Sequence, residues 1–182
     1  MDMITEGLLA EFTKEFQIDS LPEDKRFENF AGFVILKRHY SETFDPGEIV
    51  VGEGGDLTID AIGIIVNGIL INDKDALEEL FDSNPDYLDV TFVFVQAERS
   101  SNFDGAKLGS FGYGVGEFFN PKTKEPRNAR VREYVELMRR IYNKSSKFKR
   151  GKTLLKILFM PRTSRPRSQV SSSSRSLSLL GS

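Results

Sequence analysis

The chain has 182 residues, which is enough for one domain with a substantial core. It has no cysteine and a single histidine, His39, which excludes disulfides, thiolate metal sites and the imidazole pairs of zinc enzymes. The first residues are acidic and polar, and the longest apolar runs are far too short to span a bilayer. We therefore expect a cytoplasmic protein that does not contact a membrane.

The net charge of -2 conceals an uneven distribution of charged residues. Residues 1–121 hold 8 Lys and Arg against 24 Asp and Glu, whereas residues 122–182 hold 17 against 3. Such a basic segment is typical of contact with a polyanion, because it attracts phosphate charge. A solvated basic helix followed by a disordered end explains the asymmetry equally well, and charge alone does not separate the two interpretations.

Two helices are expected at the start of the chain. Apolar residues recur at helical spacing over residues 4–16 and predict an amphipathic helix of about four turns. Ser20 and Glu23 have the spacing of a capping box, which predicts a second helix from there to about Tyr40. Residues 46–56 are rich in turn-forming residues and predict a loop.

A β-hairpin is predicted after that loop. Residues 57–66 are rich in β-forming residues, and Asn67-Gly68 suits a tight turn because both of its positions need positive φ. The remaining elements are expected in this order: a short strand over residues 69–71, a helix over 73–81, a strand over 88–97, a helix over 103–119, a helix over 127–142 and a strand over 153–160. Together they predict an α/β fold.

Glycines punctuate the helix predicted over residues 103–119. Gly105, Gly109, Gly112 and Gly116 lie three or four residues apart, which would let this helix pack closely on a sheet. Each glycine costs roughly 1 kcal/mol of intrinsic helicity. We therefore expect these four positions to face the sheet.

The composition changes again beyond Pro161, where serine and arginine dominate without periodicity. Such a segment predicts disorder rather than packing. We accordingly divide the chain into an N-terminal helix over residues 1–20, a main domain over residues 21–160 and a Ser/Arg-rich tail over residues 161–182.

The two main predicted strands each carry polar residues at one end. Alternation places Asp60 on the face of Ile62 at the start of the first strand, and places Gln96 and Glu98 on the face of Phe94 at the end of the second. If these strands pair antiparallel, those ends meet. Asp60, Gln96 and Glu98 would then form a site for Mg²⁺, which takes few protein carboxylates and fills its other positions with water and substrate phosphate.

A family resemblance supports this interpretation. Three segments stand in the order found in the N-terminal region of abortive-infection phage-resistance (AIPR) proteins, and the chain is similar to that region: Phe27-Glu28, Gly54-Gly55-Asp56-Leu57-Thr58-Ile59-Asp60 and Phe94-Val95-Gln96-Ala97-Glu98. AIPR proteins resemble PD-(D/E)XK, or Mrr-type, restriction endonucleases. The likeness is strongest over residues 27–119. It implies a restriction-endonuclease-like mixed central sheet flanked by helices.

The resemblance also implies roles for individual residues. Glu28 would assist the site from a helix, Asp60 would bind Mg²⁺ or Mn²⁺, and Gln96 would open a Gln-x-Lys motif. Glu98 stands where that motif has lysine, and glutamate adds negative charge beside an anionic substrate. A cation from elsewhere would be needed to restore catalysis. Arg99 would require a bulge to reach the site, whereas Lys107 would reach back from the next helix.

Each candidate also has a purely structural interpretation. A lone aspartate such as Asp60 often caps a turn, and Asp56 suits a turn after two glycines. Glu28 could be a solvated helix residue, although it shares a helical face with Ile35. His39, near a predicted helix end, more often interacts with the last carbonyl groups than binds a metal.

Three functions remain open from the sequence. The first is a metal-dependent endonuclease acting in phage defence, here expected as a truncation or frameshift product because the AIPR likeness fades near Thr153. The second is a non-catalytic nucleic-acid-binding domain, and the third is a protein-interaction module. DNA is the expected partner, and a homo-oligomer is compatible. The residues expected to bind nucleic acid are Arg127, Arg130, Arg132, Arg139, Arg140, Lys144, Lys147, Lys149 and Arg150.

Overall fold

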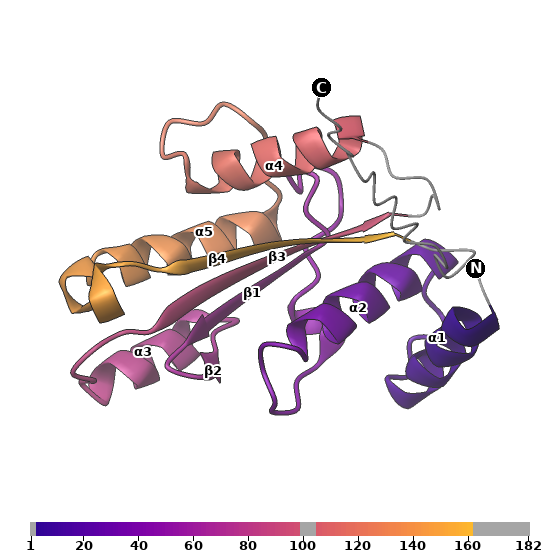
Figure 1. Cartoon of the computed structure of the whole chain (residues 1–182), viewed down its shortest axis with the longest axis horizontal. Coiled ribbons are helices and arrows are strands. Elements are labelled where there is room, and N and C mark those ends of the chain that lie inside the picture. Colours follow the sequence, from indigo (N-terminus) through magenta and orange to yellow (C-terminus); the bar gives the residue numbers. More distant parts are fainter. Residues whose placement is uncertain (1–2, 99–104, 162–182) are drawn as a thin grey trace, which may run out of the picture.

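A computed structural model describes residues 3–98 and 105–161 of the chain. These residues form an α/β fold in which helices cover both faces of a four-stranded mixed sheet (Figure 1). The predicted disordered tail lies, except for Pro161, outside the described residues. The elements are α1 (Met3–Glu15), α2 (Glu23–Leu36), β1 (Ala61–Val66), β2 (Ile69–Leu70), α3 (Lys74–Asp82), β3 (Val90–Glu98), α4 (Gly105–Phe119), α5 (Ala129–Tyr142) and β4 (Leu154–Pro161), with 3-10 turns at Pro46–Glu48, Ser145–Lys147 and Lys149–Gly151.

The sheet has the strand order β2-β1-β3-β4. β1 and β3 pair antiparallel, with Ala61 opposite Val95 and Val66 opposite Val90, so the start of β1 lies beside the end of β3. β4 runs parallel to β3 and forms one edge of the sheet. The antiparallel pairing predicted for the two main strands is therefore confirmed.

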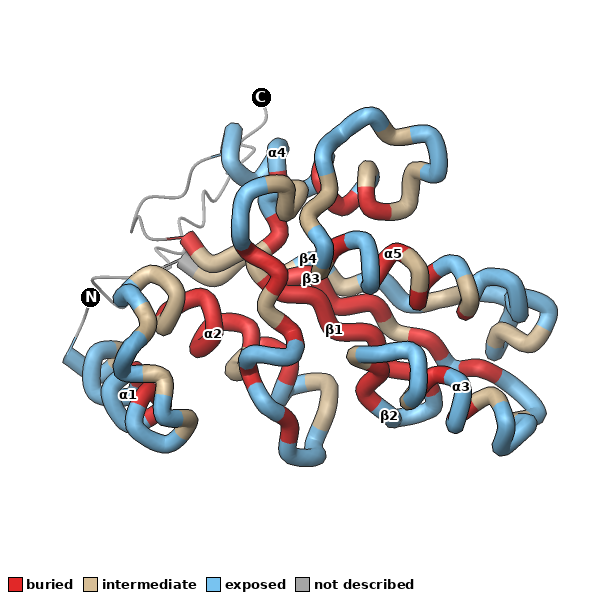
Figure 2. The backbone as a smooth tube through the Cα atoms, turned by 180° about the vertical axis from the view of Figure 1, so that it is seen from behind, coloured by how far each residue is buried: buried red, intermediate tan, exposed pale blue. Residues whose placement is uncertain are grey.

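Two apolar layers hold the sheet between the helices. Side chains of α3, α4 and α5 pack with one face of the sheet in a cluster that includes Ile62 and Phe94. α2 covers the other face through Ile35 and Leu36, and α1 packs outside α2 (Figure 1). Buried backbone is concentrated in β1 and β3 (Figure 2). These two buried strands position the residues at their ends.

Most predicted elements are confirmed within a few residues. The Asn67-Gly68 hairpin has positive φ at both positions, with values of 51° and 81°. α3 begins after Asp73, whose side chain accepts a hydrogen bond from the Ala76 amide, and α5 begins after Asn128 in the same way. The apolar residues that recur at helical spacing in α5 are all buried: Val131, Tyr134, Val135, Met138 and Ile141.

Three local predictions are wrong. The capping box at Ser20 does not form, because Pro22 is the N-cap of α2 and makes no side-chain cap hydrogen bond. α2 ends at Leu36 rather than near Tyr40, and a turn follows it. β1 starts at Ala61 rather than at residue 57, because Leu57 and Thr58 both have a φ of 59°, which is incompatible with a strand.

The four spaced glycines of α4 do not face the sheet. Gly105, Gly109, Gly112 and Gly116 are exposed, and a Cβ at any of them would meet nothing within 4 Å. The close approach is made instead by Gly114, where a Cβ would lie 1.8 Å from the carbonyl oxygen of Leu57. The spacing argument therefore identified the helix correctly but selected the wrong glycines.

Candidate functional site

Asp60 lies where the chain enters β1, beside the end of β3. Its backbone N–H donates to the Val95 carbonyl over 2.9 Å, and its Oδ2 accepts from the Ala97 amide over 2.7 Å. The carboxylate therefore reaches the backbone between Gln96 and Glu98. Because Asp60 precedes the strand, the alternation of β1 does not apply to it. Its side chain lies beside α2 and away from the apolar stripe that the sequence predicted for it.

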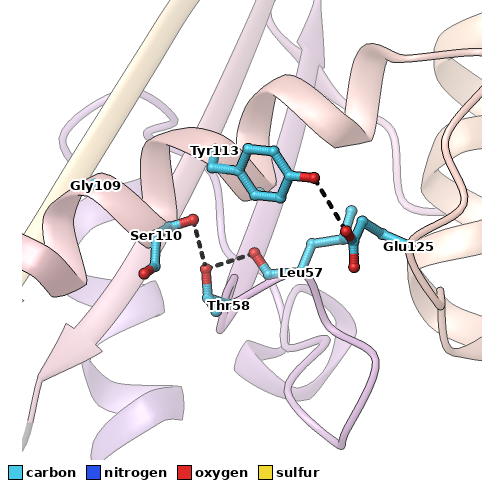
Figure 3. Close-up of a pocket in the computed structure, with 7 residues that line it drawn as sticks. Leu57, Thr58, Gly109, Ser110, Tyr113 and Glu125 are labelled. Carbon is cyan, nitrogen blue, oxygen red and sulfur yellow. Dashed lines mark hydrogen bonds between the residues drawn. The ribbon is translucent and has the colours of Figure 1, made fainter.

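The turn before Asp60 is held against α4. Asp56 stabilises it by accepting a hydrogen bond from the Thr58 amide at 2.8 Å. The Thr58 hydroxyl lies 3.2 Å from the Ser110 carbonyl, and Gly114 lets the helix backbone approach Leu57. Figure 3 shows this contact at a pocket that Tyr113 and Glu125 also line. Asp56 thus has the structural role in this turn that its position after two glycines indicated.

Glu28 and Lys25 come to Asp60 from the first turns of α2. Lys25 Nζ lies 2.7 Å from Glu28 Oε2 and 2.9 Å from the Gly52 carbonyl oxygen. A Cβ on Gly52 would lie 3.0 Å from Glu28 Oε2, 3.4 Å from Asp60 Oδ1 and 3.4 Å from Lys25 Nζ. Glycine at position 52 therefore leaves room for three charged groups around one point. We call Lys25, Glu28 and Asp60 the α2 cluster.

The charges of the α2 cluster perturb one another. Burial is the largest cause that raises the pKa of Asp60, from a usual value of 3.8 to about 7. The Ala97 hydrogen bond and Lys25 oppose this shift in pKa, whereas the negative charges of Glu28 and Asp56 add to it. Burial alone would lower the pKa of Lys25, but Glu28 raises it above its usual value, with a smaller contribution from Asp60. Lys25 is therefore a cation at neutral pH. Deprotonation of Asp60, by contrast, is unfavourable below about pH 7.

The other predicted site residues lie at the end of β3. Glu98 is buried and forms an ion pair with Lys107 of α4, whose Nζ is 2.6 Å from Glu98 Oε2. Lys107 thus reaches back to position 98 as the sequence analysis considered, whereas Arg99 lies outside the described residues. Gln96 Oε1 is buried and accepts no hydrogen bond within the described part of the chain. The structure therefore joins Asp60 to Glu28, and Glu98 to Lys107.

Mg²⁺ or Mn²⁺ would fit the carboxylates of the α2 cluster. Residues 3–98 and 105–161 contain no group of three or more His, Cys, Asp and Glu side chains arranged around a metal position. Mg²⁺ commonly uses only one or two carboxylates, together with water and substrate phosphates. Asp60 and Glu28 provide such a pair, and their mutual repulsion is the kind that a divalent cation relieves. The expected ligand set of Asp60, Gln96 and Glu98 is thereby revised toward Asp60 and Glu28.

A cavity of about 590 Å³ adjoins the α2 cluster. Lys25 and Gly52 form part of its wall, together with Asn29 and with Arg130 at the start of α5. The Lys25 side chain is 32% exposed, whereas that of Glu28 is only 10% exposed. Lys25 therefore stands between the buried carboxylates and the cavity.

Most of the basic residues expected to bind nucleic acid make contacts within the protein. Arg127 donates to the carbonyl groups that end α4, at Glu117, Phe118 and Asn120. The other contacts are Arg130 with Glu48 and Glu133, Arg132 with the Arg127 carbonyl, Arg140 with Glu78 and Glu136, Lys144 with the ring of Phe81, Lys147 with Asn84 and Pro85, and Lys149 with Asp89.

These basic residues do not form a single surface around the site. Arg127 and Arg130 lie near the α2 cluster, because Asn128 donates to the carbonyl groups of Val51 and Glu53. Lys147 and Lys149 lie beside the start of β3, at the end opposite to Glu98. The nine residues of β3 span about 30 Å. Arg139 and Arg150 are exposed.

His39 contacts a lysine of β4 rather than the helix-end carbonyl groups expected for it. Lys156 of β4 donates to its Nδ1 over 2.9 Å. Burial, followed by the charges of Lys156 and Arg38, lowers the pKa of His39 below its usual value. A neutral imidazole that accepts from a lysine is not arranged as a metal ligand.

The sequence analysis missed two residues of the site. Lys25 stands three residues before Glu28, a spacing that places both on one helical face and that could have indicated the pair. Gly52 had no comparable signal, because several glycines occur in that loop and only the folded structure shows which one faces the carboxylates.

Comparison of the chain with family models, with curated proteins and with solved structures finds no match. The site must therefore be interpreted from its own geometry. Within the described ranges, no helix combines the length and the apolar character needed to cross a bilayer.

Proposed function

We propose that the chain is a divalent-metal-dependent phosphodiesterase that acts on nucleic acid, with its active centre at the α2 cluster. The observation that carries this proposal is the convergence of Asp60 and Glu28, with Lys25, around the side-chain-free position of Gly52. Two repelling carboxylates beside a cation and a cavity are typical of a site for a metal and a phosphate rather than of a structural ion pair.

The reaction is hydrolysis of a phosphodiester. The oxygen of a water molecule forms a bond to phosphorus, and the bond from phosphorus to one ester oxygen breaks. The electron pair leaves with that oxygen, which takes up a proton, and the water loses a proton to solvent or a nearby base. A bound Mg²⁺ or Mn²⁺ supplies an acidified water and neutralises phosphate charge. Asp60 and Glu28 would hold that cation beside the side-chain-free position of Gly52.

A plasmid or oligonucleotide cleavage assay tests this proposal. We expect cleavage that requires Mg²⁺ or Mn²⁺, stops with EDTA and falls at least about 100-fold in Asp60→Asn. Asp89→Asn is the matched control, since Asp89 is half-exposed at the other end of β3 and pairs with Lys149. Cleavage that persists in EDTA, or that Asp60→Asn leaves unchanged, would refute the proposal. Single-stranded and double-stranded DNA and RNA are compared to define the substrate.

The second candidate is a non-catalytic nucleic-acid-binding domain. It is favoured by Glu98, which stands where the AIPR resemblance implies lysine and which is tied to Lys107. Salt-sensitive binding without cleavage under any metal would support this candidate. No binding at low salt would instead favour a protein-interaction module.

We further propose that the chain belongs to an AIPR-type phage-defence protein of the cytoplasm, with a restriction-endonuclease-like fold. The support is the order of the motifs that contain Glu28, Asp60 and Gln96, together with the antiparallel pairing of β1 and β3. Expression in a phage-sensitive host should reduce the phage yield, and Asp60→Asn should abolish that reduction. An equal reduction of the phage yield by the wild type and by Asp60→Asn would show that the defence effect does not depend on this site.

A further inference from the structure

Glu98 stands where the AIPR resemblance implies lysine, so the positive charge at the proposed active centre has to come from another residue. Phosphodiester hydrolysis accumulates negative charge on the phosphate oxygens, and a cation held at that point stabilises the transition state. Two lysines lie close to the carboxylates at this end of the sheet: Lys107 on α4 and Lys25 on α2.

Lys107 is held by Glu98. Its Nζ lies 2.6 Å from Glu98 Oε2, and Glu98 is buried with 7% of its surface exposed. Moving the ammonium to a substrate would leave a buried carboxylate without this partner, which is costly. Lys107 is also absent from the wall of the cavity next to the α2 cluster. Its position therefore suits neutralisation of Glu98 better than contact with a phosphate.

Lys25 is placed differently with respect to the same carboxylates. It contacts Glu28 directly and lies close enough to Asp60 to interact with its charge, yet it also forms part of the cavity wall. A divalent cation bound by Asp60 and Glu28 would compensate their charge and release the Lys25 ammonium from that task. Arg130 lines the same wall but is engaged by Glu133 and the Glu48 carbonyl. Asp45 and Glu53 also line the cavity, so Lys25 is the cation next to the carboxylates.

We propose that Lys25 contacts the substrate phosphate and is the catalytic cation of the site, in place of a lysine at position 98. This inference rests on the proposed phosphodiesterase function. The adjoining cavity of about 590 Å³ receives the nucleotide next to the scissile bond. Lys25 stabilises negative charge on the phosphate oxygens and takes no part in proton transfer. The positive charge thus comes from the helix that carries Glu28, and not from the strand that carries Gln96.

The experiment compares Lys25→Gln and Lys25→Arg with Lys37→Gln, a matched lysine just beyond the end of α2 that bonds to exposed carbonyl groups. In the metal-dependent cleavage assay, Lys25→Gln should lower kcat at least about 100-fold at saturating metal. Lys25→Arg should recover part of this loss, and Lys37→Gln should remain within about twofold of the wild type. Thermal unfolding of each variant shows whether it is folded.

A second measurement separates phosphate contact from a purely structural effect. Binding of a fluorescent oligonucleotide is followed against salt concentration in Ca²⁺, which replaces Mg²⁺ in order to prevent turnover. Losing one phosphate contact should reduce the slope of log Kd against log salt by about 0.7–0.9 in Lys25→Gln. The slope of Lys37→Gln should match that of the wild type. An unchanged slope in Lys25→Gln would overturn the proposed contact whether or not cleavage is observed.

The outcomes distinguish this inference from the proposed function. If Asp60→Asn abolishes cleavage while Lys25→Gln cleaves at the wild-type rate, the inference fails and the proposed function stands. Loss of cleavage in Lys107→Gln but not in Lys25→Gln would assign the catalytic cation to α4. If the wild type never cleaves, the phosphodiesterase proposal and the catalytic role of Lys25 both fail. The salt slope then decides the phosphate contact alone.

Discussion

Two carboxylate–lysine groups flank the end of β3, and they differ in how well their charges are matched. Glu98 is paired with Lys107 at 2.6 Å across the gap to α4. In the α2 cluster, Lys25 pairs with Glu28 and interacts with the charge of Asp60, and burial together with the charge of Glu28 raises the pKa of Asp60 to about 7. Both groups combine carboxylates with a lysine, but the α2 cluster holds two carboxylates to one lysine, and deprotonation of one of them, Asp60, is unfavourable.

This difference indicates which group is prepared for a ligand. A matched ion pair has little to gain from an added cation, whereas two carboxylates that share one lysine gain a large reduction in repulsion. Functional sites commonly retain such unfavourable arrangements, and stabilising substitutions there reduce function. The comparison therefore predicts that substitutions in the α2 cluster can stabilise the protein while they reduce its activity. Substitutions at Glu98 and Lys107 are not expected to have this combined effect.

The largest expected effect on stability comes from disturbing the contact between α4 and the turn that precedes Asp60, without altering a charge. In Gly114→Ala, the new methyl group would meet the Leu57 carbonyl oxygen at 1.8 Å, so the turn before Asp60 or the helix α4 has to move. We expect a loss of about 2–4 kcal/mol in the free energy of unfolding, measured by urea denaturation.

Gly112→Ala is the matched control for this prediction. Gly112 lies on the same helix, but a Cβ there would meet nothing within 4 Å. Alanine at an exposed helical position should raise the free energy of unfolding by up to about 1 kcal/mol. Equal effects of the two substitutions would show that α4 does not press on the turn and would remove the proposed support of Asp60.

The glycines of α4 also show what sequence alone could determine. Hydrophobic periodicity and turn residues located the helices and strands, and the β-hairpin followed from Asn67-Gly68 because few other residues accept positive φ at two adjacent positions. The identity of the packed glycine depends on how the helix is rotated against a distant turn. Spacing could not supply that rotation, and the four regularly spaced glycines proved to be exposed.

The candidate site was predictable only in part. Alternation and motif order selected Glu28, Asp60 and Gln96, and the pairing of β1 with β3 brought Asp60 to the end of β3 as expected. The side chain of Asp60 could not be oriented, since Leu57 and Thr58 adopt a left-handed conformation that ends the strand pattern. Lys25 was missed because its role depends on the loop that places Gly52 beside α2.

A smaller effect of opposite sign is expected for Asp60→Asn. The folded protein keeps Asp60 protonated up to about pH 7, whereas an unfolded chain releases that proton near its usual pKa of 3.8. The free energy of unfolding should therefore fall as the pH rises between these two values. One unit of pKa difference corresponds to about 1.4 kcal/mol, so we expect Asp60→Asn to gain on the order of 1–3 kcal/mol above about pH 7.

Urea denaturation in EDTA, from about pH 4 to about pH 8, measures this gain. The advantage of Asp60→Asn over the wild type should widen with pH and shrink when Mg²⁺ is added, because the wild-type carboxylate then gains its cation. Asp89→Asn controls for the loss of an exposed aspartate. If the free energies of unfolding of Asp60→Asn and the wild type differ by a constant amount across this pH range, the pKa of Asp60 is not raised in the folded protein. The contrast between the two carboxylate–lysine groups would then disappear.

The smallest effect on the free energy of unfolding is expected at the ion pair of Lys107 with Glu98. Lys107→Met leaves buried Glu98 without its ammonium partner, but the Lys107 side chain is 46% exposed and water can reach the position that it leaves. We therefore expect a loss of about 1 kcal/mol in the free energy of unfolding, nearer to a surface ion pair than to a fully buried one. Lys149→Met, which breaks the exposed pair with Asp89, should produce no measurable change. If Lys107→Met instead stabilises the protein, the desolvation cost of the Lys107–Glu98 pair exceeds its attraction, and this pair is not the more stable of the two groups.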